Sequence, residues 1–191
     1  GVANFRGYTS TLLTEKDCWS IMAPFKKIFK SIARVTRSLP DGFLHSRNAL
    51  NIMDIFARHL SNHVGMFTKS MDSDNILKDI MDIRLANLQS SLCLPFSPLI
   101  LEIDEFDIFK FTKQFRHDLI FRLIYFSSKL GIRFARPLRD SRNVGDTPLF
   151  TLFKDDSGLF ARSLKMFRKY NLRSISDCYD PNGLTLMTYK K

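Results

Sequence analysis

The last third of the chain repeats one pattern of residues, and this repetition constrains the fold more than any other feature of the sequence. Each copy contains an amphipathic helical stretch, a residue suited to a left-handed helix end, a polar arm and a Gly-x-Thr triplet. These parts occupy 119–126, Gly131 and 145–147 in the first copy, and 160–167, Asn171 and 183–185 in the second. The two triplet glycines lie 38 residues apart. Self-similarity at such a period indicates stacked units that bury their apolar faces against one another.

Each part of the pattern has a local physical reason. The triplet glycines stand where an extended arm must turn tightly, and glycine accepts the positive φ that such turns need. Thr147 and Thr185 are predicted to cap the helices that follow them, with Pro148 in the first turn of one helix. Gly131 and Asn171 follow amphipathic runs, so both are predicted to be left-handed helix ends.

This arrangement resembles the ankyrin repeat, whose unit opens with Gly-x-Thr-Pro-Leu and continues through a short inner helix and a longer outer helix. The first triplet reads Gly-Asp-Thr-Pro-Leu from Gly145 to Leu149, whereas Leu186 replaces the proline in the second copy. The resemblance covers about residues 95–191 and implies a stack whose fingers and groove bind another protein. It also leads us to expect further repeats beyond Lys191. An unrelated helical domain is the alternative.

Three amphipathic helices are predicted in the first half of the chain. Their ranges are 15–39, capped by Thr14, then 47–67, and finally 74–92, capped by Ser73 or Asp74. Residues 1–13 lack periodicity and are predicted to be a flexible lead-in. We therefore predict a mainly α protein with a helical bundle or cap at 14–94 and a degenerate ankyrin-like helical repeat stack at 95–191.

Composition limits the class of protein. Eighteen phenylalanines supply material for a sizeable core, which excludes a disordered chain. Cys18, Cys93 and Cys178 are far apart and odd in number, which indicates a reducing compartment. The sequence contains neither an apolar run of the roughly 18–20 residues that a membrane span needs nor a signal-peptide pattern. We expect an intracellular protein, cytoplasmic or nuclear.

Two basic sets are candidate binding residues in a chain of net charge +10. The first follows one side of the first predicted helix, beside an apolar stripe at Ile21, Phe25, Ile28, Phe29 and Ile32, and comprises Lys26, Lys30, Arg34 and Arg37. We predict a solvated helix face there; the alternative is a polyanion site for nucleic acid, acidic lipid or a groove like that of calmodulin. No zinc-finger spacing or RNA-recognition signature accompanies this set.

The second basic set lies in the first finger at a spacing of three residues: Arg133, Arg136, Arg139 and Arg142. In an extended arm these side chains can spread toward an acidic surface. They are our predicted partner-binding residues, and the predicted partner is another protein.

The chief rival interpretation comes from the stretch Leu99–Asp107, in which apolar residues precede Asp104 and Glu105. It resembles the Walker B strand of AAA-type ATPases, whose acidic pair holds Mg²⁺. The phosphate-binding Gly-x-x-x-x-Gly-Lys motif is absent from the sequence. A catalytically dead AAA-like nucleotide-binding fold is thus one alternative, and an acidic first turn of a helix opened by Ser97 and Pro98 is another.

The remaining reactive residues give no catalytic pattern. His59 and His63 share one helical face but lack a third metal ligand. Cys93 lies in an apolar stretch typical of an inert buried thiol. The sequence predicts a protein-interaction module or scaffold that is not an enzyme and binds no metal or cofactor.

Overall fold

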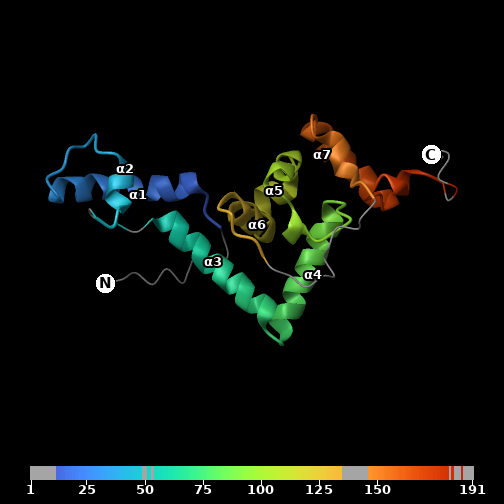
Figure 1. The fold of residues 1–191 in the computed structure, drawn as a ribbon, viewed down its shortest axis with the longest axis horizontal. Coiled ribbons are helices and arrows are strands. Elements are labelled where there is room, and N and C mark those ends of the chain that lie inside the picture. The colour runs from blue at the N-terminus through green and yellow to red at the C-terminus, as the bar shows by residue number, and fades with distance from the viewer. Residues whose placement is uncertain are drawn as a thin grey trace. The chain divides into compact units, whose positions relative to one another are not determined.

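The computed structural model describes residues 12–48, 51–52, 54–134, 146–180, 182 and 186. Seven α-helices make up most of this part of the chain (Figure 1): α1 (Glu15–Ile32), α2 (Asp41–His45), α3 (Ile55–Asp72), α4 (Ile76–Ser91), α5 (Lys113–His117), α6 (Leu119–Lys129) and α7 (Ser157–Tyr170). Four 3-10 helices join them: η2 (Pro98–Ile100), η3 (Ile103–Phe109), η5 (Leu149–Phe153) and η6 (Ser176–Cys178). Extended pairing among the described residues is limited to two isolated antiparallel bridges. The prediction of a mainly α protein is confirmed.

The chain divides into two compact units, Gly1–Met66 and Phe67–Lys191. The division falls inside α3, and the predicted boundary after residue 94 lies within the second unit. The assignment of 95–191 to a separate repeat domain stays a prediction.

Local capping explains where the helices of the first unit begin. Thr14 and Asp17 form a capping box in which the Asp17 N–H donates to Thr14 Oγ1 (3.1 Å) and the Thr14 N–H donates to Asp17 Oδ2 (2.9 Å). This start of α1 matches the prediction. The Asp54 carboxylate accepts from the Phe56 N–H at 2.9 Å, so α3 begins at Ile55 and not near residue 47.

The predicted ends of two other helices are also corrected. The helix α1 passes through Pro24 but stops at Ile32, because Arg34 adopts a left-handed conformation with φ of 52°. The Asn75 side chain caps α4 by accepting from the Leu77 N–H at 2.9 Å. Neither Ser73 nor Asp74 is the cap, since the Ser73 hydroxyl instead donates to Asn75 Oδ1 at 3.0 Å.

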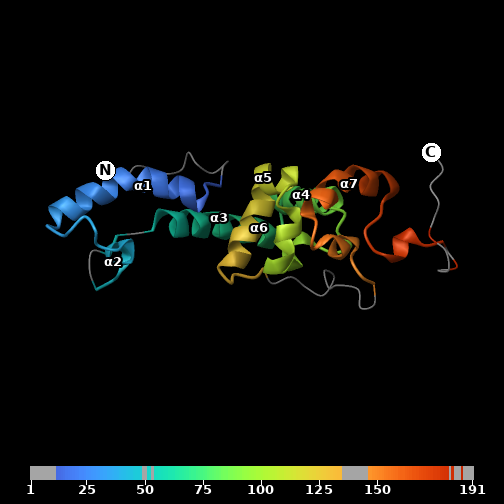
Figure 2. The ribbon, with the colours of Figure 1, turned by 90° about the horizontal axis from the view of Figure 1, so that it is seen from above.

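A cluster of phenylalanine rings forms the core of the second unit, where α4 lies beside both α6 and α7 (Figure 2). Phe109, at the end of η3, lies at its centre. Its ring centroid is 5.8 Å from that of Phe121 on α6, 5.5 Å from Phe150 on η5 and 5.4 Å from Phe160 on α7. All four side chains are almost fully buried. Edge and tilted contacts at such distances stabilise aromatic pairs beyond the burial of their area, so one ring holds four elements together.

Both predicted left-handed helix ends are present. Gly131 has φ of 74° after α6, and Asn171 has φ of 52° and ψ of 38° after α7. The Ile132 N–H donates to the Ser127 carbonyl (2.8 Å) and the Leu172 N–H donates to the Phe167 carbonyl (2.9 Å). These bonds satisfy carbonyls that the ends of the helices would otherwise leave unpaired.

The Phe109→Ala variant is expected to lose about 3–5 kcal/mol of unfolding free energy, because it removes a ring from the middle of four packed elements. Urea denaturation followed by circular dichroism measures this loss. Phe111→Ala is the matched control, since Phe111 is 53% exposed two residues away and its loss should stay below about 1 kcal/mol. Equal losses in the two variants would contradict the central place of Phe109.

The Gly131→Ala variant is expected to destabilise the protein by about 1 kcal/mol, because a left-handed φ is unfavourable for any residue with a Cβ. No atom lies within 4 Å of the added Cβ, so the cost is conformational alone. Gly65→Ala is the control: the same open surroundings within α3 predict a gain of roughly 0.5–1 kcal/mol. Thermal unfolding compares them, and a gain in both variants would contradict the interpretation of Gly131.

Candidate functional site

Two extended segments of the second unit lie antiparallel: residues 146–149 between the first triplet and η5, and residues 173–176 in the arm after α7. We call these two segments the arm pair. The Leu149 N–H donates to the Arg173 carbonyl (2.8 Å), and the Ile175 N–H donates to the Thr147 carbonyl (2.9 Å). These bonds flank the isolated bridge between Pro148 and Ser174. The arm pair thus connects the chain before η5 to the chain after α7.

Polar side chains fix both ends of the arm pair. The Ser176 hydroxyl donates to Asp146 Oδ2 at 2.6 Å, across 30 residues of sequence. This hydrogen bond is the largest cause that holds the pKa of Asp146 below its usual range, so this exposed carboxylate is ionised at neutral pH. Asp177 Oδ2 accepts from the backbone N–H groups of Arg173 and Ser174, each at 2.8 Å.

The arm pair corrects the predicted role of Thr147. Its carbonyl is held in the bridge by the Ile175 N–H, and Pro148 precedes the short η5 without any side-chain cap. The inner helix expected here is only a five-residue 3-10 helix. The corresponding cap at Thr185 lies outside the described residues.

Of the four predicted partner-binding arginines, the structure describes Arg133 alone. Arg133 is exposed two residues after the left-handed Gly131. Arg136, Arg139 and Arg142 lie outside the described residues, so their grouping stays a prediction.

The basic set predicted along the first helix, Lys26, Lys30, Arg34 and Arg37, is not one continuous solvated face. Lys26 and Lys30 keep only 8% and 9% of their surface exposed, and both contact Asp41, with Nζ–O distances of 2.9 and 3.3 Å. The prediction of a solvated face is wrong for these two lysines. Arg34 and Arg37 are exposed, so the alternative polyanion site retains two of its four cations at the surface.

Hydrogen bonds explain why two lysines can be buried here. The Lys30 ammonium donates to the carbonyls of Arg37 (3.1 Å) and Leu39 (2.6 Å), and it also contacts Asp41. Its three N–H donors thus have three acceptors. The Lys26 ammonium lies 3.4 Å from the centre of the Trp19 ring, a cation–π contact. We call the group of Lys26, Lys30 and Asp41 the lysine–aspartate cluster.

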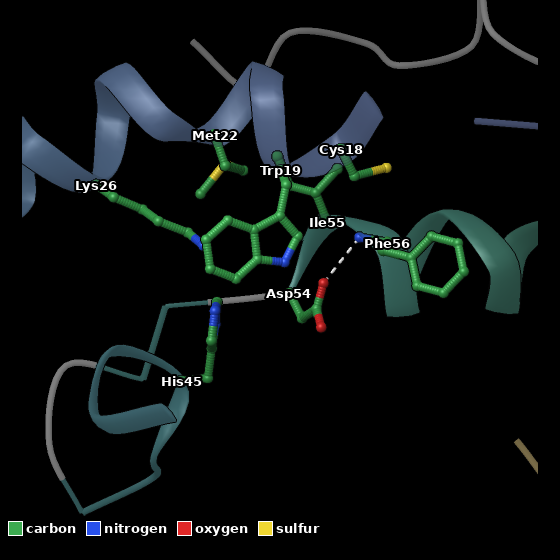
Figure 3. Close-up of a pocket in the computed structure, with 8 residues that line it drawn as sticks. All are labelled: Cys18, Trp19, Met22, Lys26, His45, Asp54, Ile55 and Phe56. Atoms are coloured by element: carbon green, nitrogen blue, oxygen red, sulfur yellow. Dashed lines mark hydrogen bonds between the residues drawn. The ribbon is translucent and has the colours of Figure 1, made fainter. Parts of the chain in front are cut away.

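The cluster adjoins a small hollow in the first unit (Figure 3). Eight residues line it: Cys18, Trp19, Met22, Lys26, His45, Asp54, Ile55 and Phe56. Its volume of about 30 Å³ holds one or two water molecules, whereas pockets for small molecules measure roughly 300–1,000 Å³. In Figure 3 the Lys26 side chain extends from α1 to the ring of Trp19 on the same helix.

The cysteines and histidines of the described residues do not form an activated or metal-binding group. Burial raises the pKa of the Cys18, Cys93 and Cys178 thiols, which favours their protonated, weakly nucleophilic forms. The ring centroids of His59 and His63 lie 4.5 Å apart. His59 Nε2 accepts a hydrogen bond from the Leu13 N–H at 3.2 Å. A cluster of three or more metal-ligating side chains is absent from the part of the chain that the structure describes.

The Walker B interpretation required a strand at residues 99–103, and this expectation is wrong. The stretch forms η2 and η3, joined through Leu101 and Glu102. The Ser97 hydroxyl accepts from the Leu99 N–H at 3.4 Å, and Asp104 and Glu105 lie in the first turn of η3. An acidic first turn is therefore the observed arrangement, although η3 begins after Glu102 and not at Ser97.

Sequence reasoning missed a basic face on α7. The segment 157–176 contains five Arg and Lys and no Asp or Glu. Arg162, Lys165 and Lys169 are exposed on one side of the helix, and we call them the α7 basic face. The run of positive charge is visible in the sequence, but which of these side chains share an exposed side depends on how α7 packs.

The comparisons with known proteins supply no relative: no protein-family model matches the chain, and searches of the curated proteins and of the solved structures gave no match. Among the helices within the described residues, none is both long and apolar enough to span a membrane.

The Asp41→Asn variant is expected to lose about 2 kcal/mol of stability at pH 7, because two buried ammonium groups lose their counter-charge. The lysine contacts hold the pKa of Asp41 below its usual value of 3.8. A depressed carboxyl pKa stabilises the fold above pH 3.8, and that contribution is lost as the pH falls through the lower folded value. The difference between wild type and variant should therefore narrow below pH 3.8.

Urea denaturation followed through Trp19, the single tryptophan, measures this difference in the first unit. Glu15→Gln removes the same charge at an exposed position and should change stability by less than about 0.5 kcal/mol. A difference for Asp41→Asn that persists unchanged below pH 3 would contradict the ionic interpretation.

Proposed function

We propose that the chain is a non-catalytic protein-binding module whose second unit is a degenerate ankyrin-like stack. The observation that carries this proposal is the arm pair. Each unit of a repeat stack contacts its neighbours. Hydrogen bonds between 146–149, at the first triplet, and 173–176, at the start of the second arm, provide a contact between the two copies. The left-handed ends at Gly131 and Asn171 lie 40 residues apart, close to the 38 residues between the triplet glycines.

The arms are suited to binding because rigid elements support them. The Phe109 cluster fixes η5 and α7, and these two helices lie between the two segments of the arm pair in the chain. Binding residues on loops held by a rigid scaffold lose little conformational entropy when they contact a partner. Arg133, together with Arg136, Arg139 and Arg142, provides positive charge for an acidic partner surface.

The chemistry of the described side chains supports binding over catalysis. The pKa of each thiol is raised, and the hollow beside Trp19 and Lys26 in the described part of the first unit is too small for a substrate. The proposed location is a reducing compartment, cytoplasmic or nuclear, since three free cysteines suit such an environment.

Site-specific photo-cross-linking tests the proposal. A benzoylphenylalanine in place of Arg133 of the full chain, expressed in the cells that produce the protein, is expected to give discrete adducts that protease removes and nuclease does not. Reversing the charge of Arg136, Arg139 and Arg142 should reduce these adducts about tenfold, because charge contacts at a protein surface each contribute roughly 0.2–1 kcal/mol.

Lys110 is the matched control position, because it is exposed in the same unit but lies after η3 and not in a finger. The same cross-linker there should give few of the adducts seen at position 133. Adducts that nuclease removes would assign the chain to nucleic-acid binding. Equal adducts at both positions would contradict a binding surface on the fingers.

A further inference from the structure

The α7 basic face lies within a run of residues whose charges are all positive. The residues from 157 to 176 include Arg162, Lys165, Arg168, Lys169 and Arg173 without any acidic residue. A surface of one sign attracts and orients oppositely charged partners. These cations form one binding surface only if they face solvent on the same side of α7.

The packing of the buried side of α7 determines which of these cations face solvent together. Phe160, Leu164 and Phe167 are 1%, 2% and 4% exposed and hold the helix against the phenylalanine core. Arg162, Lys165 and Lys169, which follow one another at intervals of three and four residues, therefore line the opposite side and are all exposed. At a rise of 1.5 Å per residue they span about 10 Å of a rigid helix.

The three cations of the α7 basic face are not neutralised by neighbours in the described part of the chain. The described ion pairs join Lys26 and Lys30 to Asp41, and Lys78 to Asp74. The Lys169 ammonium lies 5.1 Å from the Tyr170 ring, a contact that keeps its charge. Arg168 points elsewhere, since its Nε–H donates to the Leu164 carbonyl at 3.2 Å.

An apolar edge borders the basic face. Leu159 and Met166 are 43% and 47% exposed and lie seven residues apart, so they occupy nearly the same side of α7. Met166 follows Arg162 by four residues and is therefore its neighbour on the helix surface. A row of cations beside an apolar pair is the complement of an amphipathic helix with acidic and leucine-rich sides.

The apolar edge distinguishes between two kinds of polyanion. Phosphate groups of a nucleic acid need cations and hydrogen-bond donors but gain nothing from exposed leucine and methionine. An acidic amphipathic peptide uses both parts of the surface. We propose that the outer face of α7, consisting of Arg162, Lys165 and Lys169 with Leu159 and Met166, binds an acidic amphipathic helix of a partner protein. This inference rests on the proposed protein-binding function and specifies its partner chemistry.

Fluorescence anisotropy with the full chain tests this surface. The probe is a synthetic labelled helical peptide of about 20 residues, long enough to be helical alone, with glutamates on one side and leucines seven residues apart on the adjoining side. The R162E/K165E/K169E variant is expected to bind it about 30-fold more weakly than wild type, from three charge contacts. R162Q/K165Q/K169Q, which avoids new repulsion, should lose about fivefold.

The matched control reverses three exposed cations elsewhere, K16E/K27E/R84E, and should lose less than about threefold through overall charge alone. L159S/M166S should weaken the peptide several-fold while leaving any binding of duplex DNA unchanged. Circular dichroism verifies that each variant keeps its helical content, as expected for exposed positions.

Several outcomes would overturn the proposal. Equal losses of peptide affinity in the α7 variant and in the control variant would show that binding depends on net charge alone. Unchanged affinity for a peptide with glutamine in place of leucine would contradict an amphipathic partner. If DNA binds more tightly than the peptide and this binding is lost in R162E/K165E/K169E, the α7 basic face binds phosphates instead. Peptide binding without protein adducts at position 133 would contradict only the finger surface, whereas adducts without peptide binding would contradict only the α7 face.

Discussion

The packing of Phe109 is the interaction on which the second unit depends. The elements around it are short, and 3-10 helices such as η3 and η5 have too few hydrogen bonds to be stable alone. Their stability must come from burying aromatic rings against one another. Since Phe109 contacts rings on α6, η5 and α7, it holds these three helices together.

The first unit depends on a different kind of contact. Its helix α1 turns Lys26 and Lys30 inward, whereas Ile28 and Ile32, in the apolar stripe, are 54% and 75% exposed. Buried ammonium groups are tolerated only with full sets of acceptors, and Asp41 with the carbonyls of Arg37 and Leu39 provides them for Lys30. The Asp41 carboxylate, nine residues after the end of α1, thus helps to hold this side of the helix inward.

The proposed surface on α7 follows from how the second unit is held together. The same rings that bury one side of α7 force Arg162, Lys165 and Lys169 to the other. A partner would meet a preformed helix face there, which lowers the entropic cost of association. The α7 surface and the proposed finger surface also share a preference for negative charge, in accord with the net charge of +10.

The sequence by itself determined features that depend on a few adjacent residues. Thr14 with Asp17 encodes a helix start, and Gly131 and Asn171 encode left-handed helix ends, because caps are governed by local backbone and side-chain chemistry. The arm pair, the inward lysines and the α7 basic face arise from residues as far apart as Asp146 and Ser176. Only the tertiary structure decided those, since hydrogen bonds and burial between distant segments override a helix's own apolar pattern.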